Sequence, residues 1–354
     1  MLIFTNRDLQ NQPDETAFTR TFTPASSQLG YATVASTHGG VASWAVSGLR
    51  ANASDADALN ALLPLFAGTR RVLVYLHGNN NTPASCFERC ALLEALYGLE
   101  VVGFSWTSEG FLPDGTGLPG LAADSSTGDE ANLKVVTPAN RTDNGIQDKI
   151  RRYHQAKTNA QDSIDALARF LRLLGTARLH ANGQPFTLAA HSLGAHFLQY
   201  TLDVPGASES LGTAHNVALV APCVRAAGHR DWLVKIRPRG QVFVTFNQGD
   251  NVLFGALIAD GGQTKLGTDP LPDLLQSGIA RYISFTGAQV GSGGHNYFAR
   301  TNMPAKTLKV FKRIFGSSRD IEANEYPRQV YPVGCDEDGL ICYMAAPRVI
   351  DGGG

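Results

Sequence analysis

The segment Ala190-His191-Ser192-Leu193-Gly194 places a serine between an apolar run and a helix-like stretch. The run Phe186–Ala190 predicts a strand, and Ala195–Tyr200 predicts a helix. A serine at such a sharp turn is held in a strained backbone conformation, with its hydroxyl pointing out of the sheet. Small residues two positions before and after the serine let the chain pass close to its neighbours. Ala190 stands where glycine is more usual, and it adds only one methyl group. The segment therefore predicts a nucleophilic serine.

Strand-like and helix-like segments alternate along most of the chain. Val72–Leu76 is a continuous apolar run, as expected of a strand buried on both faces of a parallel sheet. The other predicted strands are Met1–Thr5, Tyr31–Val34, Val41–Val46, Val101–Ser105, Phe186–Ala190, Val217–Val220, Val242–Phe246 and Tyr282–Phe285. The predicted helices are Ser54–Leu65, Pro83–Tyr97, Asn159–Leu174, Leu271–Leu275 and Leu308–Phe315. The alternation predicts an α/β fold with a mostly parallel central sheet and helices on both faces.

A long irregular stretch divides this pattern. Three prolines and six glycines fall between Trp106 and Gln155, so neither a compact strand nor a helix is expected there. A loop of about fifty residues is far longer than usual, and such loops are mostly functional or disordered. We expect residues 1–70 to form a β extension of the same domain and 71–316 the core, with 317–354 as a tail. Residues 107–156 are expected to be an inserted lid, or else a surface excursion without a role.

Composition narrows the class of protein. Hydrophobic residues make up 43% of the chain and charged residues 17%, which provides a large core and argues against general disorder. A formal net charge of −1 does not indicate binding to nucleic acid or to an anionic membrane surface. No apolar run approaches the roughly 18 residues of a membrane span. The first residues read as a strand and not as a secretion signal, so we expect a cytoplasmic protein, with export by a non-classical route left open.

The cysteines predict free thiols. They are an odd, sparse set in a large chain, which favours a reducing compartment over a disulfide framework. The five are Cys86, Cys90, Cys223, Cys335 and Cys342. Their spacing also lacks the pairs and attendant histidines of a zinc site, so neither a metal nor an organic cofactor is expected.

A serine hydroxyl needs a base to remove its proton and a third group to orient that base. In chains with this serine turn, the acid and then the histidine follow the serine, each on a loop after a strand. Asp250 follows the predicted strand Val242–Phe246, and His295 lies on a glycine-rich loop after Tyr282–Phe285. The sequence therefore predicts Ser192, Asp250 and His295 as a catalytic triad.

The oxyanion of an acyl-transfer intermediate needs hydrogen-bond donors. The backbone N–H of Leu193, directly after the serine, is the first expected donor. The second is expected from the turn after Val72–Leu76, where Asn79 is our first choice and Asn80 the next.

Each assignment has a plainer interpretation. Asp250 also fits a simple turn residue beside Gly249, in which case Asp231 or Asp260 would be the acid. Ser192 and His295 could be a helix-start serine and a loop histidine without chemistry, and Asn79–Asn81 could be plain turn formers. His191 and His196 flank the elbow and are expected to point away from the hydroxyl. His77 is expected to anchor its own loop.

In these residues the chain resembles the alpha/beta-hydrolase superfamily, and within it the bacterial alpha/beta hydrolases catalogued as a domain of unknown function. The matching stretches occur in the expected order over almost the whole chain: Met1–Arg7, Val72–Asn80, Gly103–Ser108, Ala190–Ala195, Val220–Pro222, Asp250–Leu253 and Gly294–Phe298. The chain departs from the family at Cys223, where aspartate is frequent after Ala-Pro, and in the long insert after Trp106.

The expected activity is hydrolysis of a carboxylic ester, acylglycerol or thioester, with a small molecule or a lipid ester as substrate. An acyltransferase, or an amidase or peptidase, would use the same triad. A lipid-acting toxin delivered to other cells would also fit the pattern, as would a catalytically silent binding protein on this scaffold. The sequence leaves the oligomeric state open.

Overall fold

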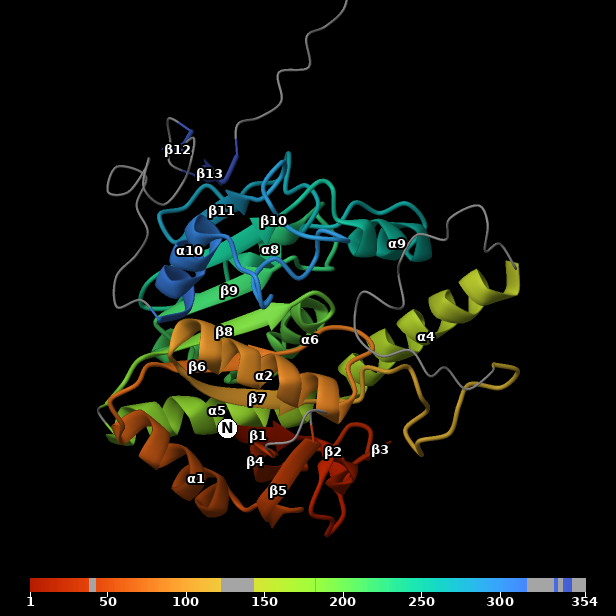
Figure 1. Cartoon of the computed structure of the whole chain (residues 1–354), viewed down its shortest axis with the longest axis vertical. Coiled ribbons are helices and arrows are strands. Elements are labelled where there is room, and N and C mark those ends of the chain that lie inside the picture. Colours follow the sequence, from red (N-terminus) through yellow and green to blue (C-terminus); the bar gives the residue numbers. More distant parts are fainter. Residues whose placement is uncertain (38–42, 122–142, 182, 317–333, 337–339, 346–354) are drawn as a thin grey trace, which may run out of the picture.

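One large sheet carries the fold (Figure 1). The computed structural model describes residues 1–37, 43–121, 143–181, 183–316, 334–336 and 340–345. The strands of the main sheet are β1 (Leu2–Thr5), β4 (Gly30–Thr37), β5 (Ser43–Arg50), β6 (Val72–Leu76), β7 (Glu100–Ser105), β8 (Phe186–His191), β9 (Asn216–Val220), β10 (Val242–Phe246), β11 (Ala280–Ser284), β12 (Gly334–Cys335) and β13 (Ile341–Tyr343). A separate hairpin pairs β2 (Arg7–Leu9) with β3 (Phe18–Phe22).

The strand order is β12-β13-β11-β10-β9-β8-β6-β7-β1-β4-β5. Every neighbouring pair from β13 to β1 is parallel, whereas β4, β5 and β12 add antiparallel edges. All residues of β6, β8, β9 and β10 are buried, which explains why these strands read as continuous apolar runs. The prediction of a mostly parallel sheet is confirmed.

Helices cover both faces of the sheet. They are α1 (Asp55–Ala67), α2 (Pro83–Tyr97), α4 (Asp143–Asp162), α5 (Ile164–Ala181), α6 (Gly194–Thr201), α7 (Ala207–Ser210), α8 (His229–Leu233), α9 (Asn251–Ala259) and α10 (Ala305–Gly316). Cys90 of α2 packs against Gly103 of β7, where a Cβ would lie 2.8 Å from its sulfur. The next residue, Phe104, packs on Phe170 of α5, with ring centroids 5.1 Å apart. Successive strand residues point to opposite faces, so α2 and α5 lie on opposite sides.

The best predicted helix, α2, has a complete set of end signals. The Thr82 side chain accepts a hydrogen bond from the backbone of Ser85, and Pro83 occupies the first turn. Gly98 ends the helix in the left-handed conformation, at a φ of 68°. Figure 1 shows α2 and α10 on one face of the sheet, and α4 and α9 beyond the ends of β8 and β10.

Two predictions about irregular and helical segments are wrong. The stretch expected to lack helix contains the start of α4, because Tyr153, Ala156 and Ala160 form a buried stripe at helical spacing among charged residues. Leu271–Leu275, expected from the sequence to be a helix, is irregular. The residue before a proline is disfavoured in the helical conformation, and Pro272 follows Leu271 directly. The predicted lid lies partly in 122–142, outside the described residues.

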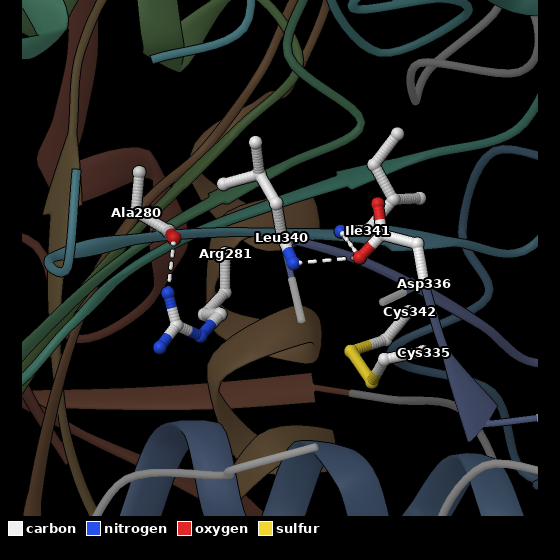
Figure 2. Close-up of a disulfide and its surroundings, with 7 residues drawn as sticks. All are labelled: Ala280, Arg281, Cys335, Asp336, Leu340, Ile341 and Cys342. Carbon is white, nitrogen blue, oxygen red and sulfur yellow. Dashed lines mark hydrogen bonds between the residues drawn. A yellow bond between two sulfur atoms is a disulfide. The ribbon is translucent and has the colours of Figure 1, made fainter. Parts of the chain in front are cut away.

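The C-terminal cysteines correct a third prediction. Cys335 and Cys342 face each other across the β12–β13 pair and form a disulfide, with Asp336 accepting hydrogen bonds from the N–H groups of Leu340 and Ile341 (Figure 2). The pairing was not predicted because an odd cysteine count does not identify partners. Cys86, Cys90 and Cys223 are free and buried.

No helix in the part of the chain described here has both the length and the apolar character needed to cross a bilayer.

The cysteine pairing predicts a thiol count. Purified protein that is denatured without reductant should titrate three thiols, since Cys86, Cys90 and Cys223 are free, and five after reduction. A Cys342→Ser variant should titrate four without reductant. Five thiols in unreduced, freshly purified protein would contradict the disulfide.

Candidate active site

Ser192 occupies the turn between β8 and α6 in a conformation that few side chains adopt. Its φ is 52°, in the left-handed region, and its side chain is almost completely buried. Its N–H donates to the carbonyl of Val220 at 3.0 Å, and its own carbonyl accepts from the N–H of Cys223 at 3.0 Å. These bonds to the end of β9 hold the strained turn in place.

Gly194 lets this turn press against the end of β6. A Cβ at this position would lie 2.7 Å from the carbonyl oxygens of both Leu76 and His77. Real Cβ atoms do not approach backbone this closely. The second small residue of the elbow is therefore required by packing against the neighbouring strand.

Asp250 is shared between a helix end and a histidine. It is the N-cap of α9, where its Oδ1 accepts the N–H groups of Val252 and Leu253, both at 3.0 Å. Its Oδ2 lies 2.6 Å from Nδ1 of His295, and both side chains are fully buried. The sequence indicated the aspartate but not the helix, because α9 is apolar on nearly all sides and shows no helical periodicity.

Asn247 joins the loop of Asp250 to the loop of His295. Its Nδ2 donates to the carbonyl of Gly294 at 2.8 Å, and its Oδ1 accepts from the N–H of Gly249. Gly294 has a φ of 68°, and a Cβ there would lie 2.6 Å from Asn247 Nδ2. Sequence reasoning missed Asn247. Its position at the end of a buried strand, three residues before the predicted acid, was the available signal.

The structure brings the predicted acid and base into direct contact beside the elbow. The ring of His295 lies 4.7 Å, centroid to centroid, from the ring of His191, which directly precedes Ser192. His191 in turn lies 4.8 Å from Phe298. Asp250 and His295, which are 45 positions apart in the chain, are therefore in direct contact, and they lie against the residue that precedes Ser192.

The two other candidate acids lie elsewhere. Asp231 is exposed, with Arg230 at 3.9 Å. Asp260 contacts Lys265 and, at 3.0 Å, Lys157. Burial alone would raise the pKa of Asp260, but hydrogen bonds and charge from the two lysines outweigh it and hold that pKa at about 2. Asp260 thus fastens α4 to the C-terminal end of α9.

The loop after β6 contains the second expected oxyanion donor. The N–H of Asn80 donates to the carbonyl of Ser108 at 2.8 Å, so this amide is engaged. The Asn81 side chain donates to the carbonyls of Gly78 and Asn79, which fixes the turn around Asn79. Of the two asparagines considered from sequence, the geometry therefore favours Asn79. Leu193 is the N-cap of α6, and its own N–H lies ahead of the first hydrogen bonds of that helix.

His77 anchors this loop, as predicted. Its Nε2 accepts the backbone N–H of Trp106 at 3.1 Å, and its Nδ1 lies 3.0 Å from the carbonyl of Gly78. The first contact requires an unprotonated Nε2, so the second is a donated hydrogen bond from a neutral ring. The indole of Trp106 stacks on this ring and donates to the His77 carbonyl.

A buried arginine braces the same region. Arg7 lies at the start of β2 with its side chain fully buried, and its Nη2 lies 2.7 Å from Glu109 Oε2. The same nitrogen donates to the carbonyl of Trp106 at 2.5 Å and to that of Asn81 at 3.4 Å. Arg7 therefore links the loops after β6 and β7. Sequence reasoning gave it no role, although a charged residue two positions after an apolar strand was visible.

His196, one turn after the nucleophile, takes no part in the Asp250–His295 pair. Burial, followed by the charges of Lys157 and Lys265, lowers the pKa of His196 to about 3. The ring is therefore neutral at physiological pH. Among the described residues, no group of three or more acidic, cysteine or histidine side chains gathers in a way that could hold a metal ion.

Gly194→Ala should loosen the elbow. The added methyl group would meet two backbone oxygens, so we expect a loss of roughly 1–3 kcal/mol in the free energy of unfolding. Urea denaturation of the full chain would measure this loss. Gly278→Ala is the control, because a Cβ at Gly278 meets no atom within 4 Å, and it should lower the free energy of unfolding much less. Gly261 also has open space, but its positive φ would strain an alanine there. Equal stability of the Gly194 and Gly278 variants would contradict the close approach.

His196 predicts a pH dependence of stability. The folded-state pKa, at about 3, lies below the unfolded value, so the unfolded chain binds the proton first as the pH falls. Stability from the neutral ring is fully present above about pH 6.5 and is lost toward pH 3, by up to about 1.4 kcal/mol per pH unit. The free energy of unfolding, measured by urea denaturation at several pH values, should therefore decrease more between pH 7 and pH 4 for the wild type than for His196→Gln. An equal decrease in the two proteins would contradict the lowered pKa of His196.

Comparison with known proteins gives the family. The family described as "Alpha/beta hydrolase of unknown function (DUF900)" matches residues 53–303, well over half of the chain. No curated protein matches the sequence. Among solved structures, the crystal structure of esterase PE8 is similar with 14% identity and a TM-score of 0.33, over 70% of this chain and 92% of that chain. A likeness at that level says nothing about substrate. With the family match over residues 53–303, the chain belongs to these alpha/beta hydrolases of unknown function.

Proposed function

We propose that this alpha/beta hydrolase is a serine hydrolase that cleaves carboxylic esters, acylglycerols or thioesters with Ser192, His295 and Asp250 as its triad. The observation that carries the proposal is the 2.6 Å contact between Asp250 Oδ2 and His295 Nδ1, beside a serine with a φ of 52°. A buried carboxylate on an imidazole, next to a strained serine at a strand end, is the arrangement that nucleophilic acyl transfer requires.

The contact with Asp250 assigns the two nitrogens of His295. A carboxylate accepts a hydrogen bond from Nδ1, so the neutral ring keeps its proton on Nδ1 and presents Nε2 as a base. In the first step Nε2 takes the proton of Ser192 as its oxygen attacks the ester carbonyl. Asp250 keeps this tautomer and stabilises the imidazolium that forms. Because Oδ1 of Asp250 is held by two backbone N–H groups, the carboxylate cannot rotate freely.

The amides of Leu193 and Asn79 are the proposed donors to the oxyanion. Both residues are buried, and each belongs to a turn fixed by several hydrogen bonds. Preorganised donors of this kind are worth about 10²–10³ in rate each. His295 then protonates the leaving alcohol, and in the second step it activates a water that releases the acid from Ser192.

Labelling with a fluorophosphonate tests the triad. Ser192→Ala should abolish covalent labelling because the attacking oxygen is gone. His295→Ala should slow labelling by roughly 10³-fold or more, because the hydroxyl loses its base. The rate of labelling, followed by intact-protein mass, is the measurement.

Matched controls separate chemistry from folding. Ser208→Ala and His180→Ala change a serine and a histidine outside the site and should label like the wild type. A panel of p-nitrophenyl esters of graded acyl length should then be hydrolysed by the wild type and not by Ser192→Ala. Labelling of the wild type at a serine other than Ser192, or undiminished ester hydrolysis by Ser192→Ala, would refute the proposal.

A further inference from the structure

A polar pocket lies between α2 and the loop that carries His295. It has a volume of about 440 Å³, within the range of small-molecule sites. Polar and charged side chains dominate its lining. Those that matter here are Asn81, Glu88, Arg89, Ser292, Asn296 and Arg300.

The pocket adjoins both halves of the proposed catalytic machinery. Asn81 belongs to the loop of the proposed oxyanion donor, and its Nδ2 donates to the Asn79 carbonyl at 2.8 Å. Asn296 directly follows His295. A histidine that protonates the leaving alcohol must lie beside it, so the alcohol part of an ester is expected on the side of the histidine loop. Ser292 and Asn296, on either side of His295 in this loop, line the pocket.

Two arginines set the charge of the pocket. Arg89 donates through Nη1 to the Ala299 carbonyl at 2.9 Å, and its guanidinium lies over the ring of Phe298, 5.6 Å from the centroid. Arg300 donates through Nη1 to the Gln289 carbonyl at 3.3 Å. Its guanidinium also lies against Gly291, where a Cβ would be 2.5 Å from Cζ. Both guanidinium groups are thus held by main chain in or beside the histidine loop.

These guanidinium groups keep donors for an anion. Each arginine has five N–H donors, and in the described part of the chain each uses one nitrogen for the carbonyl named above. Within the same described residues, neither arginine forms an ion pair with a carboxylate of the chain. Glu88 is the single carboxylate of the lining and is exposed, so the lining carries a surplus of positive charge. Guanidinium groups match the geometry of carboxylate and phosphate oxygens.

We infer that this pocket binds the alcohol part of the substrate, and that this alcohol carries a phosphate or carboxylate group which Arg89 and Arg300 contact. The inference rests on the proposed function, which it extends from esters in general to esters of an anionic alcohol. A neutral polyol would use the asparagines and serines of the lining but would leave both guanidinium groups facing water.

Three esters of one acid test the inference: 1-butyrylglycerol, 1-butyrylglycerol 3-phosphate and O-butyrylglycolate. We expect the wild type to favour at least one anionic ester over the neutral one by about tenfold or more in kcat/KM, the effect of a charge-assisted hydrogen bond. The phosphate and carboxylate arms identify which anion is preferred. The ratio of anionic to neutral ester should fall toward one in Arg89→Gln/Arg300→Gln.

Two single variants keep the test valid if the double variant Arg89→Gln/Arg300→Gln fails to fold. Arg300→Glu changes a half-buried side chain and should reverse the preference, so that the neutral ester becomes the better substrate. Arg70→Gln removes an exposed arginine that pairs with Glu100 outside the pocket, and it should leave the ratio unchanged. An unchanged ratio in both pocket variants would overturn the inference.

A binding measurement separates this inference from the proposed function. Glycerol 3-phosphate and glycolate should bind the full-length Ser192→Ala chain in calorimetry, and the double arginine variant in that background should bind at least about tenfold more weakly. If the wild type hydrolyses p-nitrophenyl butyrate but shows no anion preference and no anion binding, the inference fails and the proposed function stands. If no ester is hydrolysed while both anions bind through the arginines, the proposed function fails and the anion site stands.

Discussion

Asp250 is the residue on which the geometry of the candidate site depends. One of its oxygens caps α9 through two backbone N–H groups, and the other contacts His295. A carboxylate at a helix N-terminus is stabilised by the unpaired amides there and by the helix dipole. The fold therefore orients this carboxylate without any contribution from a substrate. The histidine is positioned by a group that is itself part of the secondary structure.

The surrounding loops are linked to one another as well as to the sheet. Asn247 ties the acid loop to the histidine loop, and Arg7 ties the loop after β6 to the loop after β7. Each of these side chains donates hydrogen bonds to carbonyl groups of a neighbouring loop. The loops after β10 and β11 are thereby fixed to each other, and so are the loops after β6 and β7. Preorganisation of this kind is what electrostatic stabilisation of an oxyanion requires.

The sequence predicted those parts of the fold whose signals are local. Strands buried on both faces gave continuous apolar runs, as in Val72–Leu76, and Pro83–Tyr97 had capping residues at both ends. α9 was missed because a helix that is apolar on nearly all sides shows no periodicity. The start of α4 was missed because its neighbours in the chain are rich in proline and glycine. The disulfide was missed because its pairing depends on β12 lying beside β13.

The site residues were predicted from chain order, and the contacts between them were not. Chain order named Asp250, Asp231 and Asp260 as possible acids, and only the packing of two loops 45 residues apart distinguishes them. The sequence likewise did not distinguish Asn79 from Asn80 as the oxyanion donor. In the structure the backbone N–H of Asn80 donates to the Ser108 carbonyl. The sequence predicted no role for Arg89 and Arg300, because residues this far apart in the chain come to line one pocket only when the chain is folded.

The carboxylates at the two ends of α9 have a mechanical consequence. Asp250 fixes the N-terminal end to His295, and Asp260 fixes the C-terminal end to Lys265 and to Lys157 of α4. A short helix pinned at both ends acts as a rigid strut. A displacement of α4 must therefore either break the Lys157–Asp260 ion pair or move α9 with it. If α9 moves, Asp250 moves as well, and the orientation of the His295 ring changes.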